Sequence, residues 1–262
     1  MTTAVLVAST LVASCGKADI GEGEPVETDS ITADTTAMLT QREGSPTCKV
    51  HIGFKLLKGT NAQRLNDSLM HAGILVPDYL ANIPASAKGR QQALAYFLAR
   101  YVDDYRRDGR LILDQEPGYA GLNWEYSATT EVRRYREGIV AYIAHVHTFE
   151  GGLYPISQTV VRNIREHDGH ILSLSDILIP GYDKTLLEEV TEQLAEDFQA
   201  DGLEGLREKG LFIGIEPYLP ENFIWGDGAI RFIYQSDEIA AHTMGEIAVT
   251  VRLKDKNIKQ WN

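Results

Sequence analysis

Two histidines near the middle of the chain have the spacing of metal ligands on a strand. His145 and His147 are separated by one residue, and Glu150 follows shortly after. Alternate residues of a strand share a face, so the imidazoles could converge on one ion with a carboxylate as third ligand and one position open. The same face also carries Ile139 and Ile143, so the alternative is that the strand simply leaves the core at its end.

This spacing is less specific than true zinc motifs, so we expect no metal and no other cofactor. We keep His145 and His147 as the candidate ligands of a rival hypothesis, a metal-dependent enzyme that acts on envelope glycans. The chain has no Gly-rich phosphate loop ending in Gly-Lys-Ser/Thr, no Gly-x-Ser-x-Gly elbow and no His-Glu-x-x-His helix. We therefore expect a protein that is not an enzyme and has no catalytic residues.

The first of the two cysteines lies directly after an apolar run. Residues 4–13 are mostly apolar, and small side chains at positions 12–14 precede Cys15. This arrangement resembles a bacterial lipobox, which implies a signal peptide over residues 1–14 and acylation of Cys15. The expected location is the cell envelope, at the periplasmic or surface face of the outer membrane. The alternative is the frayed apolar terminus of a cytosolic protein.

The lipid is the only membrane contact that we expect, because a spanning helix needs about 20 apolar residues and the sequence has no such stretch. Cys48 would then have no disulfide partner, and we expect a buried, inert thiol. A catalytic thiolate would need a nearby histidine. His51 is three positions away along the expected strand, which places it on the opposite face.

Composition limits the possible partners. The chain has 262 residues, 44% of them hydrophobic, and a formal net charge of −12. Nucleic-acid binding draws on clustered Lys and Arg, so we expect no nucleic-acid partner. Residues 15–47 are rich in Gly, Glu, Asp, Thr and Ser, which favours a flexible acidic tether between the lipid and a folded domain.

Hydrophobic periodicity predicts both helices and strands. Period-two alternation begins at Cys48, and helical spacing follows Asn61. A stronger helix carries apolar residues from Leu94 to Tyr105 and ends near Gly109; another begins near Asp183, with Leu187 and Val190 turned inward. The remaining expected strands are 124–132, 139–148, 158–166, 171–174, 223–225, 230–234 and 246–253. Grouped helices and antiparallel strands indicate an α+β fold.

Several segments together resemble a known family. The run from His147 to Tyr154 is similar to a Thr-Gly-Gly-Ala-His turn. This turn belongs to the C-terminal domain shared by the RsiV anti-sigma factor and the PdaC peptidoglycan deacetylase. Leu153 and Tyr154 stand where Ala and His are usual in that turn. Matching segments follow in order, at 163–178, 227–234 and 236–245. The last is similar to a Tyr-Glu-Ile-Ala-Pro-Tyr-Ala-x-Gly signature of that domain. In this chain Ser236-Asp237 replaces the usual Tyr of the signature.

The resemblance implies two closely associated domains, an N-terminal PdaC-like one over 48–146 and a C-terminal RsiV-like one over 147–256. RsiV-like proteins bind lysozyme and PdaC-like ones accompany peptidoglycan chemistry. A cell-wall glycan or a lysozyme-like protein is therefore the expected partner, and a scaffold of an envelope complex is the further alternative. The candidate ligand-binding residues that follow from the resemblance are Gly151, Gly152, Tyr154, Tyr234, His242 and Gly245.

Overall fold

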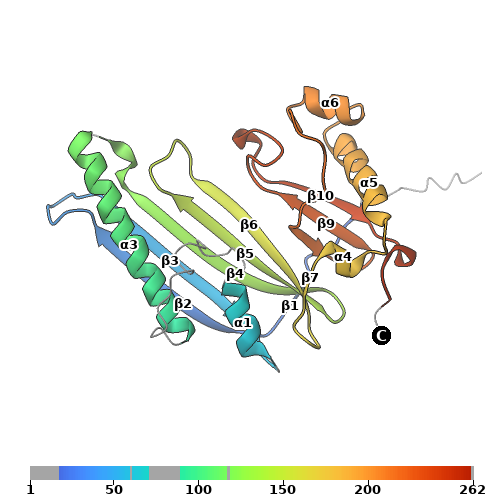
Figure 1. The fold of residues 1–262 in the computed structure, drawn as a ribbon, viewed down its shortest axis with the longest axis horizontal. Helices are drawn as coiled ribbons and strands as arrows, with labels where there is room; N and C mark the ends of the chain where they lie inside the picture. Colours follow the sequence, from blue (N-terminus) through green and yellow to red (C-terminus); the bar gives the residue numbers. More distant parts are fainter. Residues whose placement is uncertain (1–17, 60, 71–88, 117–118, 261–262) are drawn as a thin grey trace, which may run out of the picture.

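A computed structural model describes residues 18–59, 61–70, 89–116 and 119–260. Its larger sheet has the order β2-β3-β4-β5-β6-β7, and the short strand β1 pairs with β4 (Figure 1). The bounds are β1 Glu24–Pro25, β2 Asp29–Met38, β3 Thr47–Leu56, β4 Trp124–Arg136, β5 Ile139–Phe149, β6 Ile156–Arg165 and β7 Ile171–Leu172. The α+β class predicted from the sequence is confirmed.

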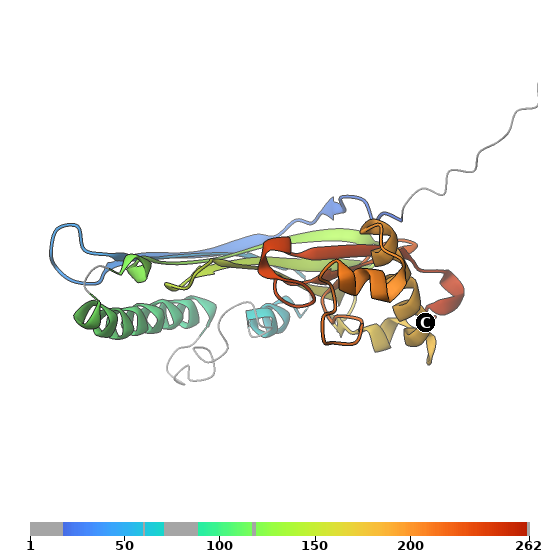
Figure 2. The same cartoon turned by 90° about the horizontal axis from the view of Figure 1, so that it is seen from above.

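The β3–β4 pair is parallel, whereas the other pairs of this sheet are antiparallel. Parallel neighbours need a crossover connection. Here the connection contains the helices α1 (Ala62–Met70) and α3 (Arg90–Gln115), which lie on the same face of the sheet (Figure 2). The sequence predicted both helices but not the parallel pairing.

Helix α3 supplies the aromatic core of the larger sheet. Its rings of Phe97 and Tyr101 lie 5.4 and 5.2 Å from the ring of Tyr126, and Tyr105 lies 5.4 Å from Trp124, all measured between ring centroids. The expected end near Gly109 is wrong, because the helix continues to Gln115. A Cβ at Gly109 would lie 2.8 Å from Leu39 Cδ1, so this glycine allows a close approach rather than ending the helix.

The flexible tether predicted for residues 15–47 is wrong over the part that the structure describes. Strand β2 pairs with β3 along its whole length, from Asp29 opposite Leu56 to Met38 opposite Thr47. Ile20 and Leu39, on either side of it, are buried. The composition of the segment did not predict this strand, because most of its outward residues are acids and hydroxyl residues. Its inward residues are partly buried against α3.

The smaller sheet has the order β10-β9-β8, with β8 Phe223–Trp225, β9 Ala229–Tyr234 and β10 Ile247–Arg252. It packs with α4 (Leu174–Ile177), α5 (Tyr182–Asp197) and α6 (Gly202–Glu208) around a second core. Leu186, and not the expected Leu187, is the fully buried residue in the first turns of α5. The 3₁₀ turns are η1 Ala120–Leu122, η2 His242–Met244 and η3 Asp255–Asn257.

The predicted domain boundary between residues 146 and 147 is also wrong, because it falls inside β5, and β6 and β7 continue the larger sheet. The change of sheet comes after β7. Side-chain amides join the two sheets there: Asn163 Nδ2 donates to the Phe223 carbonyl at 2.8 Å, and Trp225 N–H donates to Asn163 Oδ1 at 3.0 Å. Asn222 and Gln235 make equivalent bonds to the backbone of Thr159 and Val161.

Within the described residues, no helix has the length and apolar character needed to cross a membrane. Cys15 and the predicted signal peptide lie outside the described residues.

Candidate functional site

Strand β5 separates its side chains onto two different surfaces. Val140, Tyr142 and Ala144 belong to the core beneath α3, whereas Ala141 and Ile143 pack against the smaller sheet on the other face. Further along this second face the smaller sheet no longer covers β5. His145 and His147 therefore point into a groove instead of a core.

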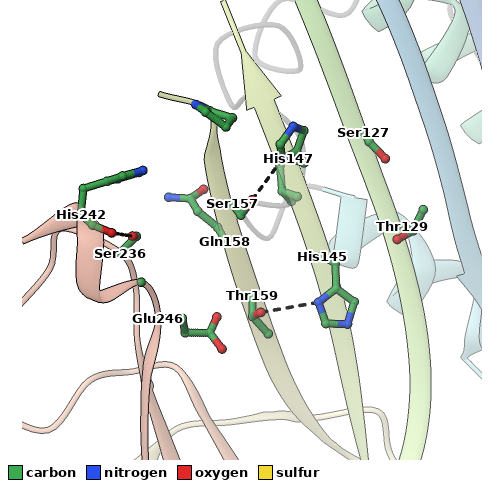
Figure 3. A pocket seen from close by; sticks show the side chains of 13 residues that line it. Ser127, Thr129, His145, His147, Ser157, Gln158, Thr159, Ser236, His242 and Glu246 are labelled. Carbon is green, nitrogen blue, oxygen red and sulfur yellow. Dashed lines mark hydrogen bonds between the residues drawn. The ribbon is translucent and has the colours of Figure 1, made fainter. Parts of the chain in front are cut away.

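The groove has a volume of about 550 Å³ and lies between the larger sheet and the loop that joins β9 to β10 (Figure 3). On the larger sheet His147 Nδ1 lies 3.0 Å from Ser157 Oγ, and His145 Nδ1 lies 3.5 Å from Thr159 Oγ1. His145 Nε2 is 3.7 Å from Glu131 Oε1. The lining residues are Ser127, Thr129, His145, Val146, His147, Pro155, Ser157, Gln158, Thr159, Ser236, His242, Gly245 and Glu246.

The loop of the smaller sheet holds a third histidine at the groove. His242 Nδ1 lies 2.8 Å from Asp237 Oδ2, and Ser236 Oγ donates to the His242 carbonyl at 3.4 Å. The ring of Tyr154, from the β5–β6 connection, stacks on the His242 ring with 5.1 Å between centroids and 22° between planes. Tyr154 remains 60% exposed despite this contact.

The structure brings together several of the residues singled out from the sequence. His145, His147, His242 and Gly245 line one groove, and Tyr154 stacks at its rim. The two glycines of the β5–β6 connection do not line it. Gly151 instead lies against the Tyr119 segment, where Tyr119 Oη donates to the Gly151 carbonyl and a Cβ on Gly151 would clash with the carbonyl oxygen of Gly121.

Tyr234 is wrong as a ligand-binding residue. Its side chain is 0% exposed, and its hydroxyl donates to the Tyr218 carbonyl at 2.6 Å. The rings of Phe212 and Tyr218 meet its ring edge-on. Burial raises the pKa of the Tyr234 phenol well above its usual range, so the group stays protonated and structural.

The metal triad of the rival hypothesis, His145, His147 and Glu150, does not form. Glu150 accepts a hydrogen bond of 2.7 Å from Tyr101 Oη of α3, which places its carboxylate away from the imidazoles of His145 and His147. In the part of the chain that the structure describes, no group of three or more His, Cys, Asp or Glu side chains is arranged to hold a metal ion.

The described residues also lack a complete set of nucleophile, base and carboxylate for nucleophilic catalysis. The Asp34–His51 pair has the oxygen-to-Nδ1 distance of 2.6 Å that a triad requires, but His51 Nε2 lies beside Gly53, 3.5 Å from where a Cβ would stand. His147 contacts Ser157 through Nδ1, and among the described residues no ion pair joins its ring to a carboxylate. The arrangement offers hydroxyl and imidazole groups for hydrogen bonds with a ligand.

The hydroxyl residues of the groove were not predicted. Ser127, Thr129, Ser157 and Thr159 come from two strands that are separated by about thirty residues, and their alternation in each strand was the only available signal. Cys48 is confirmed as a buried thiol, 0% exposed, and burial raises its pKa to about 12, with the charge of Glu150 as a smaller cause.

Residues 175–254 match the model of the family DUF3298, which is described as a protein of unknown function. Two solved structures of DUF3298 family proteins share the fold. One, from Bacteroides fragilis NCTC 9343, has a TM-score of 0.74 and 22% identity, and covers 91% of this chain and 96% of its own. The other, from Pseudomonas aeruginosa PAO1, has a TM-score of 0.60 and 15% identity, and covers 87% and 92%.

These findings confirm the resemblance expected for the C-terminal segment, and the family match begins where the larger sheet ends. No curated protein matches the chain.

Proposed function

We propose that the protein is a non-catalytic lipoprotein of the cell envelope that binds a cell-wall glycan in the groove between its two sheets. The observation that carries this proposal is the chemistry of the lining. Among the described residues that line the groove, none is Lys or Arg, and Glu246 alone has a formal charge at neutral pH. The other polar groups are hydroxyls, imidazoles and one amide.

A sugar fits this set of groups better than an anion or a lipid does. Serine and threonine hydroxyls each donate and accept hydrogen bonds, as sugar hydroxyls do, and an imidazole does the same in its uncharged form. The Tyr154 ring adds an apolar face beside them, which suits the carbon–hydrogen face of a sugar ring. A phosphate or carboxylate would need a cation that the lining lacks, and a lipid would leave the hydroxyls, imidazoles and amide of the lining without hydrogen-bond partners.

The envelope location rests on the sequence. The lipobox at Cys15 supports a lipid anchor, and the resemblance to RsiV and PdaC supports a task at the cell wall. Replacement of Cys15 by Ser should release the protein from the membrane fraction into the soluble fraction. Retention of this variant with the membranes would contradict the anchor.

A cationic protein such as lysozyme is the second candidate, and a specific observation favours it. Residues 137–161, 210–230 and 232–251 contain no Lys or Arg, and they supply most of the groove. The same region exposes apolar side chains, with Leu153 92% and Ile156 52% accessible. The same three ranges contain eight Asp and Glu residues, and this negative charge would attract a basic protein by electrostatic steering, which weakens as salt rises.

One pulldown separates the two candidates. Cys15→Ser protein is mixed with insoluble peptidoglycan or with immobilised lysozyme, at low and at moderate salt. We expect retention on peptidoglycan at both salt concentrations, since neutral hydrogen bonds do not depend on charge screening. Ser157→Ala and His147→Ala should reduce retention, whereas His167→Ala, an exposed histidine outside the groove, should not.

Retention on lysozyme alone, lost as salt rises, would replace the glycan by a cationic protein. Retention on neither would contradict both candidates and favour the scaffold alternative.

A further inference from the structure

The groove is continuous with two rows of small polar residues that cross the larger sheet. Strand register places one residue of each of β2, β3, β4, β5 and β6 side by side in each row. The first row is Asp34, His51, Ser127, His147 and Ser157, and the second is Thr32, Gly53, Thr129, His145 and Thr159. We call these ten residues the polar strip.

The polar strip lies on the face of the sheet opposite α1 and α3, and Figure 2 shows this face bare on the side of β2 and β3. The side chains of His51 and His145 are 49% and 54% exposed. The buried alternate residues of the same strands, such as Ile52 and Ala128, face the helices. A ligand in the groove could therefore extend toward β2 without displacing any described element.

Charged residues border the polar strip but are almost absent from it. On the same face, Lys49 and Glu125 precede it along β3 and β4, and Lys55 and Glu131 follow it. Within the polar strip the one acid is Asp34, whose Oδ1 lies 2.6 Å from His51 Nδ1, and none of the ten residues is Lys or Arg. The strip thus continues the neutral hydrogen-bonding chemistry of the groove over five strands.

The spacing of the strip matches a chain of sugars. Neighbouring strands lie about 4.8 Å apart, which is close to the length of one unit in an extended glycan, and four intervals span about 19 Å. Each strand offers a hydroxyl or an imidazole at this spacing in at least one of the two rows. Toward the β2 edge, Gly53 in one row and Asp34 in the other offer neither group. A straight chain that runs across the strands would meet about one such group per sugar.

We infer that the ligand of the groove is a linear, neutral, extended glycan of at least four sugar units, which continues from β6 along the polar strip to β2. This inference rests on the proposed function and adds the length and shape of the ligand. An apolar chain would find no apolar side chain in the strip, and a polyanion would find no Lys or Arg there.

A length series tests the inference. Calorimetric titration of Cys15→Ser protein with β-linked N-acetylglucosamine oligomers of two to six units should show affinity that rises until at least the tetramer and then levels. α-linked glucose oligomers of equal length serve as the control, because they curve and cannot follow a straight strip. We expect them to bind no more tightly as they lengthen.

Two variants locate the two ends of the ligand. His51→Ala, far from the groove, should weaken hexamer binding by up to about tenfold, the effect of one lost hydrogen bond, and leave the dimer unchanged. Ser157→Ala, in the groove, should weaken both. Both side chains are exposed, so the urea midpoint should stay at the wild-type value.

The outcomes separate this inference from the function on which it rests. If the dimer binds as tightly as the hexamer, the ligand is confined to the groove and the strip has no part in binding. If no oligomer binds, the inference is overturned, while retention on peptidoglycan in the pulldown would still support a glycan site.

Discussion

The two faces of the larger sheet are built from the same strands and differ in almost every property. Toward α3, Trp124 and Tyr126 are buried beneath the rings of Phe97, Tyr101 and Tyr105. On the other face, the residues of the polar strip are mostly hydroxyl and imidazole side chains that are exposed or half-exposed, and none has a large apolar side chain. A period of two along each strand thus assigns stability to one face and leaves the other for a ligand.

The buried face should respond most strongly to mutation. Phe97→Ala removes a 0% exposed ring from the centre of the aromatic core and should lower the free energy of unfolding by about 3–5 kcal/mol. His145→Ala on the polar strip should change it by less than about 0.5 kcal/mol. Urea unfolding of both variants measures the contrast, and similar losses would mean that the exposed face is also structural.

Removal of a hydrogen-bonding amide between the two sheets should lower the free energy of unfolding by an intermediate amount. Asn163 is buried and bonds to the backbone of Phe223 and of Trp225, so Asn163→Ala leaves one acceptor and one donor unsatisfied. The expected loss is about 1–3 kcal/mol by urea unfolding. A loss smaller than that of the His145→Ala control would show that the amide bridges do not hold the smaller sheet in place.

The reactivity of a thiol on each face of the larger sheet measures its exposure, and the substitutions needed should change the stability very little. In Cys15→Ser protein Cys48 is the one remaining cysteine, and burial raises its pKa to about 12, so at pH 8 the folded protein should not react with a thiol reagent. In the additional variant Ser127→Cys, the new thiol on the polar strip should react at once. Fast labelling of Cys48 in the folded protein would contradict its burial.

The raised pKa of Cys48 also predicts how the free energy of unfolding changes at alkaline pH. The unfolded chain loses the thiol proton near its ordinary pKa of 9.0, whereas the folded protein keeps it until about 12. Stability from this group is therefore complete below pH 9 and falls as the pH rises toward 12. Cys48→Ala should remove that part of the pH dependence in urea unfolding.

The sequence predicted elements better than it predicted their arrangement. Helical spacing located α1, α3 and α5, and alternation located most strands, because each signal depends on neighbouring residues. Strand β2 was missed because its exposed residues dominate the composition of its segment. The polar strip was missed because it depends on register between strands far apart in the chain, including the parallel β3–β4 pair.

The candidate site shows the same division. Tyr154, His242 and Gly245 came from the resemblance, and the structure places all three at one groove with His145 and His147. Tyr234 came from the same resemblance, but the alternation of β9 turns it into the core, where its hydroxyl has a backbone partner. Motif similarity located the segment, and only packing decided which of its side chains are accessible.

The most direct test of this account is one variant measured in two ways. His147→Ala removes an imidazole that belongs to both the groove and the polar strip. We predict that it keeps the wild-type urea midpoint and loses most of its retention on insoluble peptidoglycan. Unchanged retention, or a lower midpoint that accompanies the loss of retention, would contradict the claim that this face of the sheet is reserved for a glycan.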